Sequence, residues 1–408
     1  MSLVAVADIG TRTTKVVAGE QEEGVISLAA VGKSESNGVK NGRLVKPGSA
    51  GESLKEATKR VEEMASEQIQ SIHLGIGGKP LRFSTNEATV TITSEDRIIS
   101  QRDVARLKDL VSSIEVGTNN KIISTIPQGF TLDGQEGVTN PVGLQGRRLG
   151  VVATLVTVDD KWVNNFKETA SRAGCELAGL LPLPQCLGGL LLTEEERTRG
   201  KALIDFGGET TELLLFREGG LVEQDSFSLG GKNLTGDLSA KLNVPREEAR
   251  NIKHKFDLSG PREELKTSNQ FQDGPKKYGE RKRWEMHSTL SDRTQEIFEM
   301  ILSRARERNQ EQLLNYGIKI TGGSSRLDGL IKFLNDTFEP HFERGTPTRP
   351  VVGIKDVVED PGYGPVLGLL NCITDERIED KGTTSHDSGE FKLFTWIREK
   401  LRTVFPGS

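Results

Sequence analysis

The sequence predicts an α/β protein made of two similar lobes that face one cleft, and three segments carry this prediction. In Val4 to Glu20 an apolar run ends at Asp8, turns, and continues as a second apolar run, which is the pattern of a β-hairpin with a polar turn. Ala202 to Phe216 repeats the pattern around Asp205. Ile318 to Leu330 adds a short strand, a Gly-Gly turn and a helix start. The duplication predicts two similar half-molecules.

The three turns share a chemistry that suits phosphate. A D-x-G-T turn presents backbone N–H groups and a hydroxyl that can bind phosphate oxygens, and its acidic side chain can hold a hydrated Mg²⁺. The N–H groups and the dipole at the start of the later helix also favour anions. One such turn is a weak signal, because Gly-Thr turns close many ordinary hairpins, but three turns facing one cleft predict a nucleotide site. The expected ligands from the turns are Asp8, Gly10, Thr11, Arg12, Thr13, Thr14, Lys15, Asp205, Gly207, Gly208, Glu209, Thr210, Gly322, Gly323 and Ser324, with Asp8 and Asp205 holding Mg²⁺ through water.

Composition excludes several classes of protein. A chain of 408 residues is long for a single core and favours two or more lobes. The net charge of −5 gives no general case for nucleic acid. The three cysteines lack C-x-x-C spacing and the five histidines are scattered, so neither a zinc site nor a disulfide framework is expected. An intracellular, reducing location follows, and the absence of a leader before the first strand argues against secretion.

The first lobe continues with a helix and another strand. Ala50 to Gln70 has apolar residues at helical spacing, and Ile72 to Gly77 is a short apolar strand. Together with the paired Asp turns, this order resembles the actin, Hsp70 and sugar-kinase superfamily. Residues 79–158, with a strand at Ala88 to Thr93 and a helix from about Ser100 to Ser113, depart from the usual plan of that superfamily.

The departing segment carries the most specific motifs. IPQ at residues 126–128, QEG at 135–137 and NPVGL at 140–144 resemble the signature of the bacterial cell-division protein FtsA. By itself NPVG indicates only a turn that fixes the chain direction. The likeness extends from residue 4 to the region of residue 372 and returns in the C-terminal tail. It implies an actin-like two-lobed α/β fold with duplicated β-β-β-α-β-α cores around a nucleotide cleft that binds ATP and Mg²⁺. It also implies a relocated small subdomain, 1C, that contacts neighbouring subunits and division partners.

The resemblance also implies a division into subdomains. The expected parts are 1A at 1–78, 159–198 and 346–372, 1C at 79–158, 2A at 199–236 and 301–345, 2B at 237–300, a flexible linker at 373–389 and an amphipathic helix at 390–408.

The segment that joins the lobes follows 1C. Trp162 to Ala173 is an expected helix. Leu177 to Leu192 is the most apolar stretch, but Pro and Gly residues interrupt it and it is too short to span a bilayer, so a buried strand followed by a core helix is expected. Thr193 to Gly200 is interpreted as a charged connector, which places the lobe boundary near Arg199.

A helix in the second lobe departs from the family pattern. FtsA carries A-E-x-I-K in a helix whose Glu and Lys flank the nucleoside, whereas residues 249–253 read ARNIK here. The lysine, Lys253, matches and Arg250 replaces the glutamate. Gly231 and Lys232, which follow the last strand of the second Asp turn, are expected at the same site.

Glu209 is the second departure, because the family's second turn has a third glycine there. A carboxylate about 5 Å from a phosphate charge costs roughly 3 kcal/mol at an effective dielectric of 20. One hypothesis is that Arg12, just after Thr11 in the first turn, pairs with Glu209 across the cleft and braces the lobes. The alternative is that Glu209 points to solvent.

The polar stretch from Ser259 to Met286 contains the basic residues Lys276, Lys277, Arg281, Lys282 and Arg283. It is interpreted as a solvated loop or as a steering surface for an acidic partner. Leu290 to Asn309 is the helix that follows. In FtsA, 2B binds the acidic C-terminal tail of the tubulin-like FtsZ, partly through an arginine in I-E-P-R-x-x-E-I. The sequence LSDRTQEI matches at Arg293, Glu296 and Ile297, so the resemblance implies that Arg293 grips a partner carboxylate.

The C-terminal stretch Glu390 to Phe405 has helical periodicity and two distinct faces. Such a helix lies well in the interface of an anionic bilayer, although docking on the protein's own body is the commoner role of an amphipathic helix. FtsA has such a tail in the same place. The residues expected at the membrane are Phe391, Phe394, Trp396, Ile397, Leu401, Val404 and Phe405 on the apolar side, and Lys392, Arg398, Lys400 and Arg402 on the cationic side.

The sequence and the resemblance together predict a filament-forming adaptor. ATP in the cleft would favour self-association, and the tail would hold the polymer to anionic lipids on the cytoplasmic face of the membrane. Subdomain 2B would capture FtsZ at the division site. The filament would then recruit later division proteins. No catalytic residue is identified, so hydrolysis is expected to be slow at most. Three alternatives remain: a small-molecule kinase or phosphatase of the superfamily, an adaptor like the pilus-assembly protein PilM, and a diverged FtsA that does not bind ATP.

Overall fold

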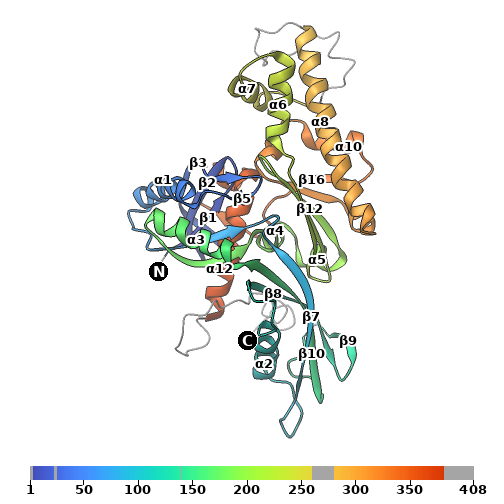
Figure 1. The fold of residues 1–408 in the computed structure, drawn as a ribbon. Helices are drawn as coiled ribbons and strands as arrows, with labels where there is room; N and C mark the ends of the chain where they lie inside the picture. The colour runs from blue at the N-terminus through green and yellow to red at the C-terminus, as the bar shows by residue number, and fades with distance from the viewer. Residues whose placement is uncertain (1–2, 23–24, 139, 260–279, 381–408) are drawn as a thin grey trace.

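The structure is a computed structural model that describes residues 3–22, 25–138, 140–259 and 280–380. Figure 1 shows two lobes and a smaller inserted subdomain. Lobe I lies on the left, lobe II rises to the upper right, and the inserted subdomain extends below both. The predicted tail helix, its eleven membrane residues and the lysines at 276 and 277 lie outside the described residues. Within the described ranges, no helix is both long and apolar enough to cross a bilayer.

Lobe I is built on a sheet with the strand order β11-β6-β1-β2-β3-β17. Side chains alternate between the two faces of its first strand, as the pleat requires. Ala5 and Ala7 pack with helices on one face, whereas Val4 and Val6 pack with helices on the other. Both faces are therefore buried. The strands are β1 Val4–Ile9, β2 Thr13–Glu22, β3 Val25–Glu35, β6 Ser71–Ile76, β11 Glu176–Pro182 and β17 Val351–Val352.

Four helices cover these two faces. The helices α1 Pro47–Ala65 and α3 Asp160–Ala173 cover the first face, and α4 Leu183–Leu191 and α12 Gly364–Asp380 cover the second. The predicted hairpin and the β-β-β-α order of the first lobe are confirmed. A small hairpin, β4 Val39–Lys40 and β5 Arg43–Leu44, precedes α1.

Lobe II repeats the plan with the strand order β14-β13-β12-β15-β16. Its core contains Phe206, Phe298 and Phe342, whose rings pack edge to face with centroids 5.5 and 5.9 Å apart. The elements are α5 Glu194–Arg199, β12 Lys201–Phe206, β13 Thr211–Arg217, β14 Gly220–Phe227, α6 Gly231–Leu242, α7 Arg246–His254, α8 Glu280–Glu307, α9 Glu311–Leu314, β15 Ile318–Thr321, the 3₁₀ helix η2 Gly323–Arg326, α10 Leu330–Thr337 and β16 Phe342–Arg344.

The inserted subdomain has its own sheet, in the order β7-β10-β8-β9, and its own small core. Its helix α2 begins with a capping box in which Ser100 and Asp103 exchange hydrogen bonds with each other's backbone N–H. The elements are β7 Arg82–Thr91, α2 Gln101–Ser112, β8 Asn120–Leu132, β9 Gln135–Val138 and β10 Arg148–Asp159. The chain returns to lobe I through α11 Lys355–Val358 and the 3₁₀ helix η3 Pro361–Tyr363.

Four elements differ from the sequence-based prediction. The charged connector is the helix α5, because Thr193 and Glu196 form a capping box. Helix α8 begins at Glu280, inside the stretch predicted as a loop, and α12 continues to Asp380, inside the predicted linker. The third Gly-Gly turn leads into the short 3₁₀ helix η2, and α10 starts only at Leu330. The anion-binding N–H groups expected there therefore belong to a single tight turn.

Candidate functional site

The turns of the two predicted hairpins face each other across a cavity between the lobes. In the first hairpin Asp8 pairs in register with Lys15, and in the second Asp205 pairs with Glu212. A Cβ atom added to Gly208 would lie 3.1 Å from the hydroxyl oxygen of Thr11, so the turns approach closely. The cavity between them has a volume of about 510 Å³. This size is within the range of small-molecule sites.

Strand alternation decides which predicted residues reach this cavity. Thr13 and Lys15 line it, whereas Thr14 points to the opposite face of β2. Thr14 is fully buried, and its hydroxyl oxygen lies 2.6 Å from that of Ser36. The prediction that Thr14 binds the nucleotide is therefore wrong, because its side chain is already bonded inside lobe I. All the other predicted nucleotide residues line the cavity.

The deepest part of the cavity is acidic, and we call Asp8, Asp205 and Glu212 the acidic floor. Burial raises the pKa of Asp8, which Lys15 partly offsets. Burial and the neighbouring Asp8 raise the pKa of Asp205 to about 7. Burial and Asp205 raise the pKa of Glu212 to about 8. Near neutral pH the acidic floor therefore holds protons, and an arriving cation would displace them.

Glu212 was missed by sequence reasoning. Its carboxylate accepts a hydrogen bond from Gln224 Nε2 at 2.8 Å and faces Gly77 and Gly78 of lobe I. The signal was present, because Glu212 follows Asp205 by the same number of residues that separates Lys15 from Asp8. The turn motif ends at Thr210, and the two-residue period of the strand brings Glu212 to the same cavity.

Lys15 is the cation of the floor. Its ammonium group donates a hydrogen bond to the carbonyl of Gly362 and lies 5.3 Å from the centroid of the Tyr363 ring. Burial lowers the pKa of Lys15, while Asp8 and Asp205 oppose that effect. The side chain thus joins the first hairpin to η3 and neutralises part of the floor.

The opposite side of the cavity is cationic, and we call its side chains the cationic wall. Burial, together with the positive charges of Arg12 and Arg250, lowers the pKa of Lys253 to about 8. Burial and Lys253 lower the pKa of His254 in the same direction. Arg250 donates to Glu247 at 2.6 Å, but its Nε is buried without a hydrogen-bond partner. The members of the cationic wall are Arg12, Lys33, Arg250, Lys253, His254 and Arg326.

Glycines shape the space between floor and wall. A Cβ added to Gly231 would lie 2.2 Å from the Ser324 hydroxyl oxygen and 3.1 Å from Lys253 Nζ. Ser324 donates to the Gly207 carbonyl at 2.7 Å, and Lys253 donates to the Gly231 carbonyl at 2.9 Å. Gly322 has a φ of 92° and its backbone abuts Asp205, so only glycine fits there. The three predicted turns therefore converge on one site.

Glu209 takes neither of the two positions that the sequence suggested. It makes an ion pair with Lys232 at the start of α6 and accepts a hydrogen bond from the backbone N–H of Asn41 at 2.7 Å. No ion pair joins it to Arg12, although both side chains lie within the described residues. Its side chain is only 12% exposed, so it does not point to solvent. Lys232 and the backbone N–H hold the pKa of Glu209 below its usual value despite burial.

These residues fit a nucleotide carrying a hydrated cation. The cationic wall has more positive charge than its own partners neutralise, and the orphaned Arg250 Nε is a free donor for an anion. The described residues contain no cluster of three or more His, Cys, Asp or Glu side chains that could enclose a metal. Asp8 and Asp205 can hold Mg²⁺ only together with water or phosphate oxygens, which is how Mg²⁺ is usually bound.

Family models match two parts of the chain. Residues 78–157 match the model described as the SHS2 domain inserted in FtsA, and residues 202–368 match the model for the cell-division protein FtsA. The chain belongs to the FtsA family. It is 28% identical to FtsA of Pseudomonas aeruginosa over 369 residues, covering 89% of this chain and 87% of that protein. It is 25% identical to FtsA of Escherichia coli over 422 residues, covering 98% of each.

Solved structures give the fold. The PilM–PilN type IV pilus biogenesis complex superposes with a TM-score of 0.59 at 18% identity, covering 90% of this chain and 97% of that one. MreB5 of Spiroplasma citri bound to AMPPNP gives 0.53 at 12% identity, covering 93% and 99%. At these identities the likeness concerns the fold alone. The predicted actin-like α/β fold with an FtsA-type inserted subdomain is confirmed.

The residues that the FtsA resemblance assigned to a partner have partners within the chain. Arg293 on α8 makes an ion pair with Asp237 on α6 and a 2.8 Å bond to Glu296. Ile297 is 1% exposed and belongs to the core of lobe II, so it is not a contact residue for a partner. The prediction for Ile297 is corrected accordingly, because its place on α8 points inward. Arg293 and Glu296 remain at the surface.

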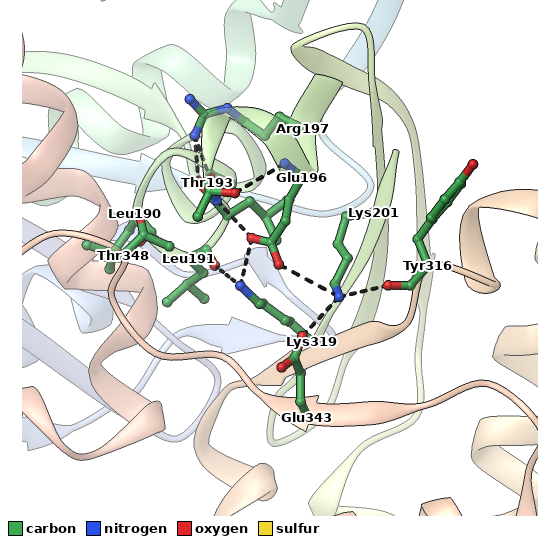
Figure 2. Close-up of polar contacts among 12 residues, drawn as sticks. Leu190, Leu191, Thr193, Glu196, Arg197, Lys201, Tyr316, Lys319, Glu343 and Thr348 are labelled. Atoms are coloured by element: carbon green, nitrogen blue, oxygen red, sulfur yellow. Dashed lines mark hydrogen bonds and ion pairs between the residues drawn. The ribbon is translucent and has the colours of Figure 1, made fainter. Parts of the chain in front are cut away.

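A second polar cluster joins the lobes where β12 and β15 begin (Figure 2). Glu196 on α5 accepts hydrogen bonds from Lys319 Nζ and from the Thr193 N–H, each at 2.8 Å, and lies 3.7 Å from Lys201 Nζ. Lys319 also donates to the carbonyl of Leu191 at the end of α4. Lys201 donates to Glu343 and to the Tyr316 carbonyl. We call these side chains the hinge cluster, because they tie α4 of lobe I to β12, β15 and β16 of lobe II.

Proposed function

We propose that this member of the FtsA family binds ATP with Mg²⁺, assembles into filaments, and tethers FtsZ filaments to the cytoplasmic face of the cell membrane at the division site. Recruitment of later division proteins is part of the same proposal. The observation that carries it is the convergence of both hairpins and the η2 turn on a cavity with an acidic floor and a cationic wall. Such a pair of surfaces suits a phosphate chain that brings its own cation.

The residues divide the work between charge and shape. Lys253, Arg250 and Arg12 supply positive charge for phosphate or ribose oxygens, and the glycine turns let backbone N–H groups approach. Asp8 and Asp205 would hold the hydration shell of Mg²⁺, which neutralises phosphate charge when it is bound. Glu209 adds no net charge to the site, because Lys232 neutralises it. The cost expected for a carboxylate in the second turn is therefore largely offset within the chain.

Glu212 is the residue of the acidic floor that we consider as a candidate base for a water molecule. With a pKa of about 8 it retains its proton near neutral pH, so it acts as a hydrogen-bond donor rather than as a base. A site whose candidate base is protonated hydrolyses ATP slowly. We therefore propose a nucleotide-controlled adaptor and, at most, a slow ATPase.

Partner capture would use the surface around Arg293. Its guanidinium is paired with Asp237, which lies on α6 next to the cavity-lining Thr235. An acidic FtsZ tail would take the place of Asp237, because both groups offer a carboxylate to the same guanidinium. The amphipathic tail would supply weak membrane binding that becomes useful when many copies act together.

Two binding assays on the full chain test this proposal. The first is co-sedimentation with phosphatidylglycerol vesicles, with and without Mg²⁺-ATP. Phe394→Asp should abolish sedimentation because it charges the apolar face, whereas Thr403→Asp, the same charge on the opposite face of the predicted helix, should retain most of it. Equal loss in both variants, or no binding by the unmodified chain, would contradict membrane tethering.

The second assay measures binding of a labelled peptide from the C-terminal tail of FtsZ. Arg293→Glu should weaken binding at least tenfold, since it replaces attraction by repulsion. The matched variant Asp237→Asn frees Arg293 and should leave binding equal or tighter. If both variants weakened the peptide to the same degree, the Arg293–Asp237 pair would be a structural brace and not the FtsZ site.

A further inference from the structure

Two of the three cysteines lie against each other on the rear side of lobe I. Cys186 on α4 and Cys372 on α12 have their sulfur atoms 3.1 Å apart, and neither is in a disulfide. A disulfide needs a sulfur separation of about 2.05 Å, so closure requires a movement of about 1 Å. We propose that Cys186 and Cys372 are a disulfide-forming pair, a reversible modification site for peroxide or small-molecule disulfide oxidants.

The packing of the two helices fixes this proximity. Helix α12 crosses α4 so closely that a Cβ added to Gly368 would lie 2.9 Å from the Cys186 carbonyl oxygen. Gly75 receives Leu183 of α4 and Leu369 of α12 on the same side of the sheet, with both side chains 2.8 Å from an added Cβ. The glycines thus allow both helices to press together, and the thiols meet where they do so.

Access differs between the two thiols in a way that suits stepwise oxidation. Cys186 is fully buried, whereas Cys372 is a partly exposed residue at the edge of the same core. Cys372 would therefore react with the oxidant first, and Cys186 would resolve the product from inside. Neither residue belongs to the acidic floor, the cationic wall or the hinge cluster, so the proposal does not rest on the proposed nucleotide site.

The chemistry balances with hydrogen peroxide as the oxidant. The Cys372 thiolate attacks one peroxide oxygen, the O–O bond breaks, and hydroxide leaves, which gives a sulfenic acid. The Cys186 sulfur then attacks the sulfenic sulfur, the S–O bond breaks, and water forms as the S–S bond closes. Two thiols and one peroxide become one disulfide and two waters. A disulfide oxidant such as oxidised glutathione does the same by two exchange steps that release two thiols.

Cys175 is an internal control, because it has the same side chain without the geometry. It is buried near α3, and its thiol donates to the carbonyl of Ile69 at 3.3 Å. Burial, with a smaller effect from Glu62, raises the pKa of Cys175 to about 11, so little thiolate is available. Oxidation should pass over Cys175 and join the other two.

The bond would link two helices that both reach the cavity. Leu183 at the start of α4 and Pro365 at the start of α12 line the cavity, and α4 continues into α5 and the hinge cluster. A covalent tie between α4 and α12 would hold these helices in one relative position. Under oxidising conditions the disulfide would therefore restrict movement of α4 and α12 next to the hinge cluster.

The test is oxidation of the full native chain with hydrogen peroxide, followed by alkylation of free thiols and peptide mapping. We expect the number of free thiols to fall from three to one within a single chain, with the Cys186 and Cys372 peptides joined. The Cys175→Ser variant should form the same link, and Cys372→Ser should form none. The melting temperature of the oxidised chain should rise by about 5 °C and return with dithiothreitol.

Several results would overturn the proposal. They are a persistent count of three thiols, a link that includes Cys175, links only between chains, or oxidation that lowers the melting temperature. Since Cys186→Ala leaves a cavity in a packed core, the conclusion rests on the unmodified chain and on the half-exposed Cys372→Ser variant.

Discussion

The two Asp hairpins have the same length and register but carry opposite charges. Residues 8–15 read DIGTRTTK and residues 205–212 read DFGGETTE, so the first has one acid and two bases and the second has three acids. Arg12 and Glu209 occupy equivalent positions, as do Lys15 and Glu212. The shared Asp, Gly and Thr residues build the same backbone, and the positions between them are free to differ in charge.

The difference teaches how the chain tolerates three acids at a proposed anion site. Asp205 and Glu212 retain protons because burial raises their pKa values, and Glu209 is paired with Lys232. Meanwhile the bases of the first hairpin remain available, Lys15 at the floor and Arg12 at the wall. The first hairpin therefore contributes cations and the second contributes neutralised acids. Each prediction below alters one member of this arrangement.

Removal of Lys15 should have the largest effect of any single substitution. Lys15→Met leaves the buried Asp8 without its cation, which should cost about 3–5 kcal/mol of unfolding free energy. Urea denaturation measures this loss, with Lys33→Met on the more exposed wall as the control. A loss below about 1 kcal/mol would show that the floor does not depend on Lys15.

The pH dependence of stability should reveal the protonated floor. The folded-state pKa values of Asp205 and Glu212, about 7 and about 8, lie above their ordinary values of 3.8 and 4.5. Their contribution to stability is complete below the ordinary values and is lost as the pH rises through 7 and 8, on the order of 6 kcal/mol from pH 5 to pH 8.

Glu212→Gln should flatten this decline, because glutamine keeps the shape and cannot lose a proton. Denaturant midpoints measured from pH 5 to pH 8 provide the comparison, and Glu223→Gln on the neighbouring strand is the control. An equal slope in the unmodified chain and in Glu212→Gln would contradict a protonated Glu212.

Nucleotide binding should take up protons near pH 8 through Lys253. The lowered pKa of Lys253, about 8, leaves its amine partly neutral near pH 8. A bound anion would raise this pKa, so the amine would take up a proton on binding. The affinity for nucleotide should therefore fall as the pH rises above 8. Calorimetry in buffers of different ionisation enthalpy measures the uptake. Lys253→Met should remove it and weaken Mg²⁺-ATP by about 1.5–3 kcal/mol. Lys255→Met, at an exposed lysine just after the end of the same helix, should change neither quantity.

Substitutions in the Glu209–Lys232 pair should have the smallest effect, a change in affinity for Mg²⁺-ATP. The direction of that change is informative. Lys232→Met leaves a carboxylate uncompensated and should weaken Mg²⁺-ATP by about 1 kcal/mol, a modest value because Lys232 is 56% exposed. Glu209→Gly should leave affinity equal or slightly higher. The double variant should return to the value of Glu209→Gly, and additive losses in the double-mutant cycle would mean that the two residues act separately.

The backbone of both hairpins could be predicted because apolar alternation and glycine turns are local signals. It was harder to predict which side chains reach the cavity. Thr14 was assigned to the site by its place in the turn, but the two-residue period of the strand sends it inward. Glu212 was overlooked although the same period brings it to the floor.

Contacts between distant parts of the chain could not be predicted. Lys232 and Asn41 meet Glu209 only because helix α6 of lobe II and the small hairpin of lobe I close over the same turn. The Arg293–Asp237 pair likewise depends on how α8 packs against α6. The chain offers many oppositely charged candidates for each of these residues, and the sequence pattern does not rank them.

The hinge cluster fixes one end of the central strands of lobe II to lobe I. Lys201 and Lys319 are held at one end of β12 and β15, and Asp205 and Gly322 lie only about 13 Å away along the strands. Helix α8, with 28 residues, extends for about 42 Å in the same lobe. In a rotation of lobe II about the hinge cluster, the outer end of α8 at the top of the lobe would travel farther than the cavity turns (Figure 1).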